Sequence, residues 1–322
     1  MNILFSGDFI PIYPVRFECN GILIGNLECA FADVNINNLK AYTSVLTKDK
    51  IDFISKTKFS ALSLANNHTY DANNFDAVYN ELKERFPKIL FFGTKKVPYA
   101  SFGDIAIIGC LERSRSRGSA IFPEEKVIDL LKVLRNKYNK IYIYPHWGKE
   151  GEYTRWPSPE QLKLAHRWID CGADGIFGSH SHVFQGKEIY RDKPIYYSLG
   201  NFYFPHEESK SYNDTSCGIV VSINNDTASE KFYSFNDKSI FTANKEINSK
   251  ILLEISSKLL HWNLWGWAKA VGPLYLSKNT NSWKIRLKKN LFRSFPLFCI
   301  WRVMPKTLLF RIASLFAKRE HK

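Results

Sequence analysis

Short apolar runs recur along the chain and predict the buried strands of an α/β fold. We interpret as strands residues 2–6, 22–26, 61–65, 89–93, 105–109, 141–145 and 195–199. Between some of them, residues 75–86, 124–138 and 159–172 carry apolar side chains at helical spacing. Pro159 lies near the start of the last helix and Gly172 at its end, as is usual for helix termini. Strands that alternate with helices in this way favour packed α/β sheets.

The pattern changes after residue 200. Two further predicted strands, 218–223 and 230–235, follow one another with no clear helix between them. We therefore expect the body of the protein to end in β-structure. A polar run at 224–250 then leads to the C-terminal part. These features predict a folded domain over residues 1–240 and a helical, basic and aromatic-rich extension over residues 241–322.

The positive charge of the chain is concentrated at its C-terminal end. Residues 284–322 hold eleven Lys and Arg and one acidic residue, whereas residues 1–283 hold 34 basic and 30 acidic side chains. Leu, Phe, Ile and Trp alternate with the basic residues of this tail, and Pro296 and Pro305 divide it into short amphipathic helices. As the binding partner of this tail we rank first an anionic membrane surface. Its lipids would contribute about 1 kcal/mol of binding free energy per nearby Lys or Arg. Packing on the body ranks second, and nucleic acid is unlikely because Leu and Phe are so abundant.

Cysteine usage and the apolar pattern predict a cytoplasmic protein, peripheral to the inner face of the cell membrane through its tail. The six cysteines are scattered and form no Cys-x-x-Cys pair, which indicates a reducing compartment. Asp8 interrupts the apolar N-terminus, so the first residues do not resemble a signal peptide. No run of about 18 apolar residues occurs, and we expect no membrane-spanning helix.

Five strand-like segments, among them GIFGS at residues 175–179, are each followed by side chains that can bind a metal. These are Asp8; Asn26 and Glu28; Asn66, Asn67 and His68; His146; and His180 and His182. Loops at the carboxyl ends of strands in an open α/β sheet face one crevice, so we expect these side chains to converge. An extended backbone would also point His180 and His182 in one direction. A lone His-x-His is more often a polar surface turn, but the other four strand ends favour a metal site.

The candidate ligands combine oxygen and nitrogen donors and include no thiolate. They are Asp8, Glu28, Asn67, His146, His180 and His182. This mixture suits Mn, Zn or Fe rather than an iron–sulfur cluster or a Cys-rich structural zinc site. Six ligands exceed what one tetrahedral zinc needs and fit two divalent ions about 3.5–4 Å apart with one carboxylate between them. Such a pair would hydrolyse a phosphoester with a metal-bound hydroxide as the nucleophile.

Six stretches of the chain occur in the order found in a known family. They are GDF (7–9), GNLE (25–28), ANNHTYD (65–71), HWGKEGEY (146–153), GADGIFGSHSHVFQ (172–185) and YYSLGNFYF (196–204). Together they resemble the CapA family of poly-gamma-glutamate and capsule biosynthesis proteins, a branch of the calcineurin-like metallophosphoesterase superfamily. The resemblance covers residues 1–235 and implies a two-sheet α/β sandwich flanked by helices, with metals at one edge.

The resemblance also implies roles for individual residues. It implies ligands of the first metal at Asp8 and His182, ligands of the second at His146 and His180, a bridging carboxylate at Glu28 and an asparagine ligand at Asn67. His68 matches the catalytic histidine, which acts as general acid or stabilises the phosphate. Outer residues that orient ligands or contact the substrate are implied at Asn26, Asp71 and Asn201.

Two positions depart from ordinary metallophosphoesterases. Their first motif is Asp-x-His, whereas Asp8 is followed by Phe9 and Ile10, and their second motif has Asp where this chain has Glu28. Ile10 removes a nitrogen ligand from the first metal, which leaves a site with a single ion as an alternative. The three arginines of ERSRSRGS (112–119) either meet an anionic substrate or lie in a solvated loop.

Two functions of different classes follow from these features. The first is a metal-dependent hydrolase that cleaves a phosphoester of a phosphorylated glycan, lipid-linked intermediate or polymer in the synthesis of capsule or another cell-surface polymer. The second is a non-catalytic metal-binding factor for the assembly or export of an anionic polymer such as poly-gamma-glutamate. The six-ligand set favours the first, and the missing histidine after Asp8 motivates the second.

Overall fold

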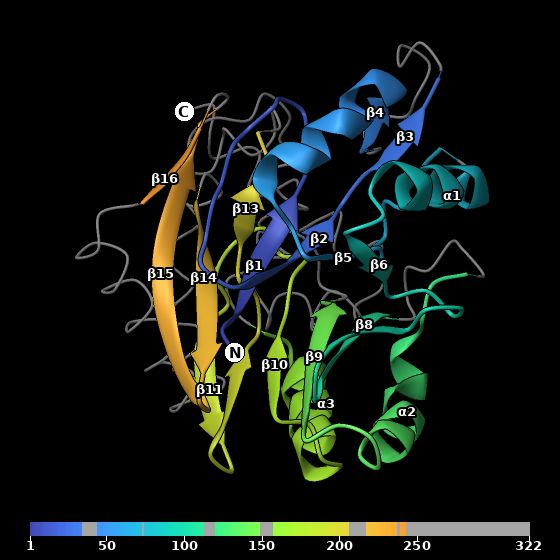
Figure 1. Ribbon diagram of the computed structural model, residues 1–322. Helices are drawn as coiled ribbons and strands as arrows, with labels where there is room; N and C mark the ends of the chain where they lie inside the picture. The colour runs from blue at the N-terminus through green and yellow to red at the C-terminus, as the bar shows by residue number, and fades with distance from the viewer. Residues whose placement is uncertain are drawn as a thin grey trace, which may run out of the picture.

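Two mixed sheets form the body of the protein (Figure 1). The computed structural model describes residues 1–33, 44–72, 74–112, 120–148, 157–205, 217–236 and 239–242. A short two-stranded sheet, β3 (Ala30–Ala32) with β4 (Val45–Thr47), is added beside them. The predicted C-terminal tail and the arginines of residues 113–117 lie outside the described residues.

The first sheet has the order β16-β15-β14-β1-β2-β5-β6, and β13 also pairs with β1. Its strands are β1 (Ile3–Phe9), β2 (Ile22–Leu27), β5 (Ala61–Ser63), β6 (Leu90–Phe92), β13 (Asn201–Tyr203), β14 (Cys217–Asn224), β15 (Thr227–Phe235) and β16 (Ile240–Thr242). β1, β2, β5, β6 and β13 run parallel, whereas β14, β15 and β16 add antiparallel pairs. The expected β-rich end of the body is confirmed, and β16 runs two residues past the predicted boundary at residue 240.

The second sheet has the order β11-β12-β10-β9-β8-β7. Its strands are β7 (Tyr99–Phe102), β8 (Ile105–Leu111), β9 (Lys140–His146), β10 (Gly175–Phe177), β11 (Lys187–Tyr190) and β12 (Lys193–Tyr196). β8, β9, β10 and β12 are parallel, and the antiparallel strands β7 and β11 form the two edges. The parallel centre reflects the helices that intervene in the sequence.

Helices flank the sheets on two sides. The 3-10 helix η2 (Lys48–Thr57) and α1 (Phe75–Arg85) lie beside the first sheet, and α2 (Val127–Leu134) and α3 (Pro159–Asp170) beside the second (Figure 1). α3 begins as its sequence predicts, with a capping box between Ser158 and Gln161 and Pro159 in the first turn.

The predicted helix over 124–138 is wrong in extent. Residues Glu124–Lys126 form a 3-10 turn, η4, and the α-helix ends at Leu134. The next side chain, Arg135, reaches away from the helix to the Asp174 carboxylate at 2.6 Å. Lys137 N–H then bonds to the Leu134 carbonyl, a tightened final turn.

Aromatic side chains join the two sheets face to face. Phe5 of β1 stacks on Phe177 of β10 with ring centroids 3.9 Å apart. The Tyr144 hydroxyl of β9 donates to the Ser6 carbonyl of β1 at 2.5 Å. A second apolar cluster packs α1 and η2 against the other face of the first sheet. The structure is thus the two-sheet α/β sandwich flanked by helices that the sequence predicts.

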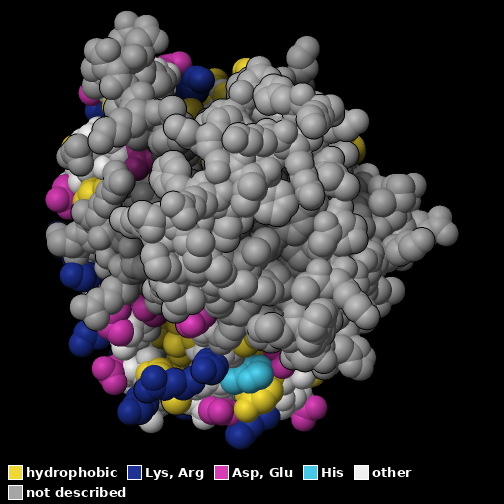
Figure 2. Space-filling model, turned by 180° about the vertical axis from the view of Figure 1, so that it is seen from behind, with side chains coloured by type: hydrophobic (Ala, Val, Ile, Leu, Met, Phe, Trp, Pro, Cys, Tyr) yellow, Lys and Arg dark blue, Asp and Glu magenta, His cyan; other side chains and the backbone are white. Residues whose placement is uncertain are grey.

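The described surface carries both signs of charge. Seen from behind, Lys and Arg side chains alternate with Asp and Glu over the visible described part (Figure 2), in keeping with the near balance of residues 1–283. Within the described residues, no helix has the length and apolar character needed to span a membrane.

Candidate metal centre

The carboxyl ends of parallel strands from both sheets meet at one place. Asp8 lies within β1, where it pairs with Asn26 of β2 and Asn201 of β13. Glu28 directly follows β2, and His146 is the last residue of β9. Because parallel strands end at a common edge, these residues converge although they are far apart in the sequence.

A close backbone approach places Asp8. A Cβ atom on Gly7 would overlap the Gly200 carbonyl, and the Asp8 N–H donates to that carbonyl at 3.1 Å. The register of β1 against β2 also shifts between Phe5 and Asp8, and such irregularities redirect side chains. The glycine of the GDF motif is therefore needed for the contact between β1 and β13.

The turn after β5 carries Asn67 and His68 and is held by Asn66. The Asn66 amide donates to the Leu27 carbonyl at 2.8 Å and to Asn26 Oδ1 at 3.1 Å. Its own oxygen accepts from the His68 N–H at 3.0 Å. Asn66 is 2 % exposed, so these bonds are shielded from water. The sequence predicts Asn66 as a polar strand end but gives it no role.

His180 and His182 do not lie in an extended segment. Their φ angles are 102° and 59°, so the expectation that strand alternation points both rings in one direction is wrong. A left-handed backbone is costly for residues other than glycine and persists where neighbouring contacts enforce it. One such contact runs from the His180 N–H to Asp8 Oδ2 at 3.1 Å.

One group of candidate ligands surrounds the Nε2 atom of His146. This atom lies 2.6 Å from Asn67 Oδ1, 3.0 Å from His180 Nδ1 and 3.3 Å from Glu28 Oε1. The other ring nitrogen, Nδ1, is 3.1 Å from the Ser179 hydroxyl. A histidine that binds a metal through Nε2 carries its proton on Nδ1 and donates it to a neighbouring oxygen. Ser179, which the sequence interpretation missed, is placed to accept that proton.

The second group consists of Asp8, Glu28 and His182. His182 Nδ1 lies 3.4 Å from Asp8 Oδ2, 3.9 Å from Glu28 Oε2 and 2.9 Å from Asn201 Oδ1. Within each group the donor atoms lie within 4.8 Å of one another, and Glu28 is shared by both groups. A shared carboxylate is what a bridge between two ions requires.

Burial and charge at this cluster suit a cation. Asp8 and Glu28 are both 0 % exposed, and neighbouring buried carboxylates are costly unless positive charge compensates them. Burial acts to raise the pKa of Asp8, but His182, followed by His146 and Asn26, outweighs it and lowers the pKa below its ordinary value of 3.8. Asp8 is therefore ionised at neutral pH, and the carboxylate, imidazole and amide donors fit Mn, Zn or Fe.

His68 is oriented by Asp71 beside the cluster. His68 Nδ1 is 2.6 Å from Asp71 Oδ2, which also accepts from the Ser44 N–H at 2.9 Å. Nε2 is thereby the ring nitrogen left for proton transfer. His68 is 8 % exposed, whereas His146, His180 and His182 are each 2 % exposed. Among the described residues, the side of His68 is thus the more open side of the cluster.

His166 lies away from this cluster. Its Nε2 is 2.9 Å from Glu188 Oε1, and its ring stacks on Tyr190 with centroids 3.9 Å apart. His166 is therefore a packing side chain and no part of the candidate metal site. His206 lies outside the described residues.

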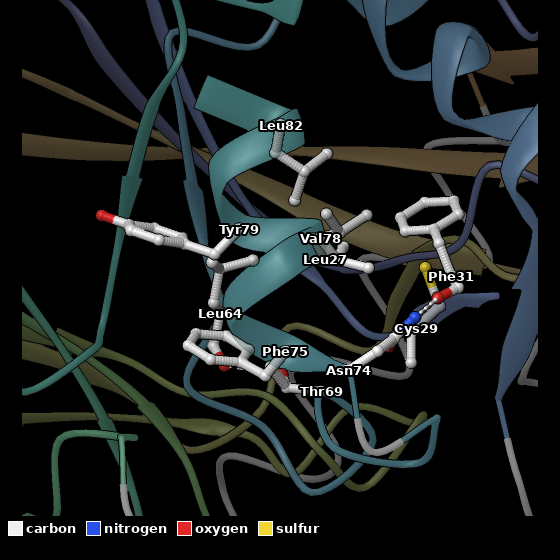
Figure 3. Close-up of a pocket in the computed structure, with 11 residues that line it drawn as sticks. Leu27, Cys29, Phe31, Leu64, Thr69, Asn74, Phe75, Val78, Tyr79 and Leu82 are labelled. Atoms are coloured by element: carbon white, nitrogen blue, oxygen red, sulfur yellow. Dashed lines mark hydrogen bonds between the residues drawn. The ribbon is translucent and has the colours of Figure 1, made fainter. Parts of the chain in front are cut away.

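A small apolar cavity beneath α1 contains none of the predicted site residues (Figure 3). Leu27, Cys29 and Thr69 are among the residues that line it. Burial, with smaller contributions from Glu28 and Asp71, raises the pKa of the Cys29 thiol. Cys29 is therefore a neutral packing side chain here, and the cavity adds no charged group to the site.

Comparison with known families supports the motif assignment. Residues 111–206 match the model of a family described as "Bacterial capsule synthesis protein PGA_cap". This segment includes His146, His180, His182 and Asn201.

Two curated relatives carry the CapA name. The capsule biosynthesis protein CapA of Bacillus anthracis is 30% identical over 178 residues, which is 49% of this chain and 43% of that protein. The PGA biosynthesis protein CapA of Bacillus subtilis is 29% identical over 176 residues, 49% of this chain and 46% of that protein. The match thus spans less than half the length of either relative.

Similarities to solved structures are weak. The Haemophilus influenzae NAD nucleotidase gives a TM-score of 0.38 at 17% identity and covers 63% of this chain and 47% of that one. The 5'-nucleotidase precursor of Thermus thermophilus gives 0.45 at 13% identity and covers 81% of this chain and 59% of that one. Scores this low identify no function.

The similarity to the CapA family therefore rests on the ordered motifs and on the sequence matches. The motif resemblance to the CapA family is confirmed: residues 111–206 match the bacterial capsule synthesis family PGA_cap, and the chain is a relative of the CapA proteins of two Bacillus species.

Proposed function

We propose that this protein is a metal-dependent hydrolase that cleaves a phosphoester during the synthesis of capsule or a related cell-surface polymer. The observation that carries the proposal is the sharing of Glu28 by two groups of candidate ligands, with the His68–Asp71 pair beside them. Two divalent ions bound there would activate a water molecule and hold the phosphoryl oxygens of the substrate.

The residues around the cluster would bind the ions and move one proton. Asp8 and His182 would hold one ion, and His146, His180 and Asn67 the other, with Glu28 between them. His68 would donate its Nε2 proton to the leaving oxygen as the phosphorus–oxygen bond breaks. Asp71 would keep the His68 ring in the orientation that this transfer needs.

Two asparagines would hold the ligands in place. Asn26 Nδ2 donates to Asp8 Oδ1 at 2.8 Å and would hold this carboxylate beside the His146 ring, whose Nδ1 lies 3.1 Å away. Asn201 Oδ1 lies 2.9 Å from His182 Nδ1 and would help to hold the His182 ring in place. Outer residues of this kind orient metal ligands and raise their affinity.

The substrate that we propose is a phosphorylated glycan, a lipid-linked intermediate or a polymer precursor. The names of the two Bacillus relatives, capsule and PGA biosynthesis, support this class. We further propose that the protein acts in the cytoplasm at the inner face of the membrane, a location supported by the scattered cysteines and the basic tail.

A phosphate-release assay tests the proposal. The purified chain loaded with Mn²⁺ is expected to release phosphate from an aryl phosphate or from a nucleotide-sugar or lipid-linked phosphosugar. Asp8→Ala and His180→Ala should abolish this release, whereas His166→Ala, a histidine outside the cluster, should leave it unchanged. A wild-type chain that binds Mn²⁺ stoichiometrically but releases no phosphate from any of these compounds rules out the hydrolase.

A non-catalytic assembly or export factor is the second candidate. It is favoured by Ile10, which stands where ordinary metallophosphoesterases have a histidine and is 1 % exposed, so that no ligand is available at that position. This candidate predicts binding of both metal and poly-gamma-glutamate without turnover. It also predicts that His68→Ala restores polymer production in cells that lack the gene, whereas the hydrolase predicts that it does not.

A further inference from the structure

The loop that follows β9 is tied to the end of β8 by a side chain. Glu112 comes directly after β8, and its N–H donates to the His146 carbonyl at 3.1 Å. In a continuing parallel ladder, the next bond would run from the Gly148 N–H to the Glu112 main-chain carbonyl. Instead, the Glu112 carboxylate accepts from the Gly148 N–H, with Oε2 2.7 Å from the nitrogen.

This bond acts at a constrained point of the backbone. Gly148 has a φ of 117°, a value that favours glycine. A Cβ atom on Gly148 would lie 3.6 Å from His180 Cδ2 and 3.6 Å from the side-chain amide of Gln161, in the first turn of α3. Gly148 therefore lies against the ring of one candidate ligand and two residues after another, His146.

We propose that Glu112 is a positioning residue for His146 and His180. By accepting the Gly148 N–H, it holds the start of the loop in the conformation that directs the two rings toward each other, with His146 Nε2 and His180 Nδ1 3.0 Å apart. A side-chain oxygen that accepts this main-chain amide takes the place of the missing ladder bond and so restrains the start of the loop. The inference rests on the proposed function, because it assigns Glu112 a role in metal binding.

A pair of variants separates the reach of the side chain from its charge. Glu112→Gln keeps the length and an acceptor oxygen but removes the charge. Glu112→Asp keeps the charge but is one methylene shorter and falls short of Gly148. If positioning is the role, Gln binds metal as the wild type does, whereas Asp weakens binding by about 10–100-fold, the range for lost outer contacts of metal ligands.

Asp174 offers a matched control, because its carboxylate accepts a main-chain N–H at the start of β9, whereas Glu112 accepts one just after the end of β9. Its Oδ2 accepts from the Ile141 N–H at 2.9 Å, as Glu112 accepts from a main-chain amide after β9. Asp174→Ala is therefore expected to lower the melting temperature and to leave metal affinity unchanged.

The experiment is a calorimetric titration of the metal-free full chain with Mn²⁺, together with the visible spectrum of the Co²⁺-loaded protein. Circular dichroism checks that each variant is folded. We expect weaker Mn²⁺ binding and an altered Co²⁺ spectrum for Glu112→Asp, and wild-type behaviour for Glu112→Gln and Asp174→Ala.

Three results contradict the proposal. If Glu112→Asp binds Mn²⁺ as the wild type does, or if Glu112→Gln is weakened as much as Glu112→Asp, the reach of Glu112 does not position the ligands, and the proposed hydrolase is unaffected. If the wild-type chain binds neither Mn²⁺ nor Co²⁺, the proposed function fails, and the role of Glu112 fails with it.

Discussion

Replacement of Asn66 by Ala is expected to lower the free energy of unfolding by about 3 kcal/mol. The side chain makes three buried bonds with fixed partners: the Leu27 carbonyl, Asn26 Oδ1 and the His68 N–H. Each buried hydrogen bond contributes about 1 kcal/mol net, which gives about 3 kcal/mol for the set. The Thr69 hydroxyl lies 2.9 Å from Asn66 Oδ1 but adds nothing to this sum. Its single proton can go to the Leu64 carbonyl at 2.7 Å instead.

Equilibrium unfolding in urea measures this loss, since a stability change at constant slope shifts the midpoint. Asn74→Ala is the matched control: its amide makes one bond of this kind, to the Phe31 carbonyl at 2.8 Å, and about 1 kcal/mol should be lost. A midpoint for Asn66→Ala equal to that of the wild type or of Asn74→Ala would refute the claim that Asn66 clamps the turn. The same variant should also bind Mn²⁺ more weakly, because Asn67 directly follows the lost clamp.

Three further predictions concern catalysis, pH and the membrane. His68→Ala should reduce turnover by about 10²–10⁴-fold. Asp71→Asn should reduce it by about 10–100-fold, and an Asp71→Asn enzyme with wild-type kcat would show that Asp71 does not act through His68. Burial acts to raise the pKa of Asp174, but Arg135, the Ile141 N–H and Lys193 outweigh it and lower the pKa below 3.8. Its contribution to stability is therefore complete above pH 3.8 and lost as the pH falls through the folded-state pKa. The stability gap between the wild type and Asp174→Asn in urea should accordingly close in acid, and a gap independent of pH would contradict this assignment. Removal of residues 284–322 takes away eleven basic residues and should abolish co-sedimentation with vesicles that contain anionic lipid; undiminished co-sedimentation would count against a membrane-binding tail.

Much of the architecture follows from local patterns. Apolar runs identified the central strands, and the proline and glycine around α3 marked its limits, because burial and helix capping depend on neighbouring residues. The helix η2 and the short strands β3, β4, β7, β11, β13 and β16 escaped prediction, since their sequences carry no clear period. The end of α2 at Leu134 also escaped it; there the Arg135 side chain donates to Asp174, a partner distant in the sequence.

At the candidate site, too, the sequence predicted the types of residue, whereas their contacts came only from the fold. The residue types at the strand ends predicted a metal centre, and the structure brings Asp8, Glu28, Asn67, His146, His180 and His182 together, while their individual roles stay predictions. The reason offered for His180 and His182 was wrong: a left-handed turn, rather than strand alternation, separates their rings into two groups. The contacts of Asn66, Ser179 and Glu112 had no counterpart in any local pattern.

Local sequence patterns were enough to identify the main core strands, the donor atoms at their ends and the family that the ordered motifs resemble. The motif resemblance implied a bridging role for Glu28, but its place within reach of both ligand groups came only from the folded structure. The same holds for the contacts of Asn26 with Asp8 and His146 and for the reach of Glu112 to the loop after β9. The physical reason is that distances between side chains far apart in the sequence depend on strand order and register. Those are properties of the whole set of pairings, and no short stretch of the chain encodes them.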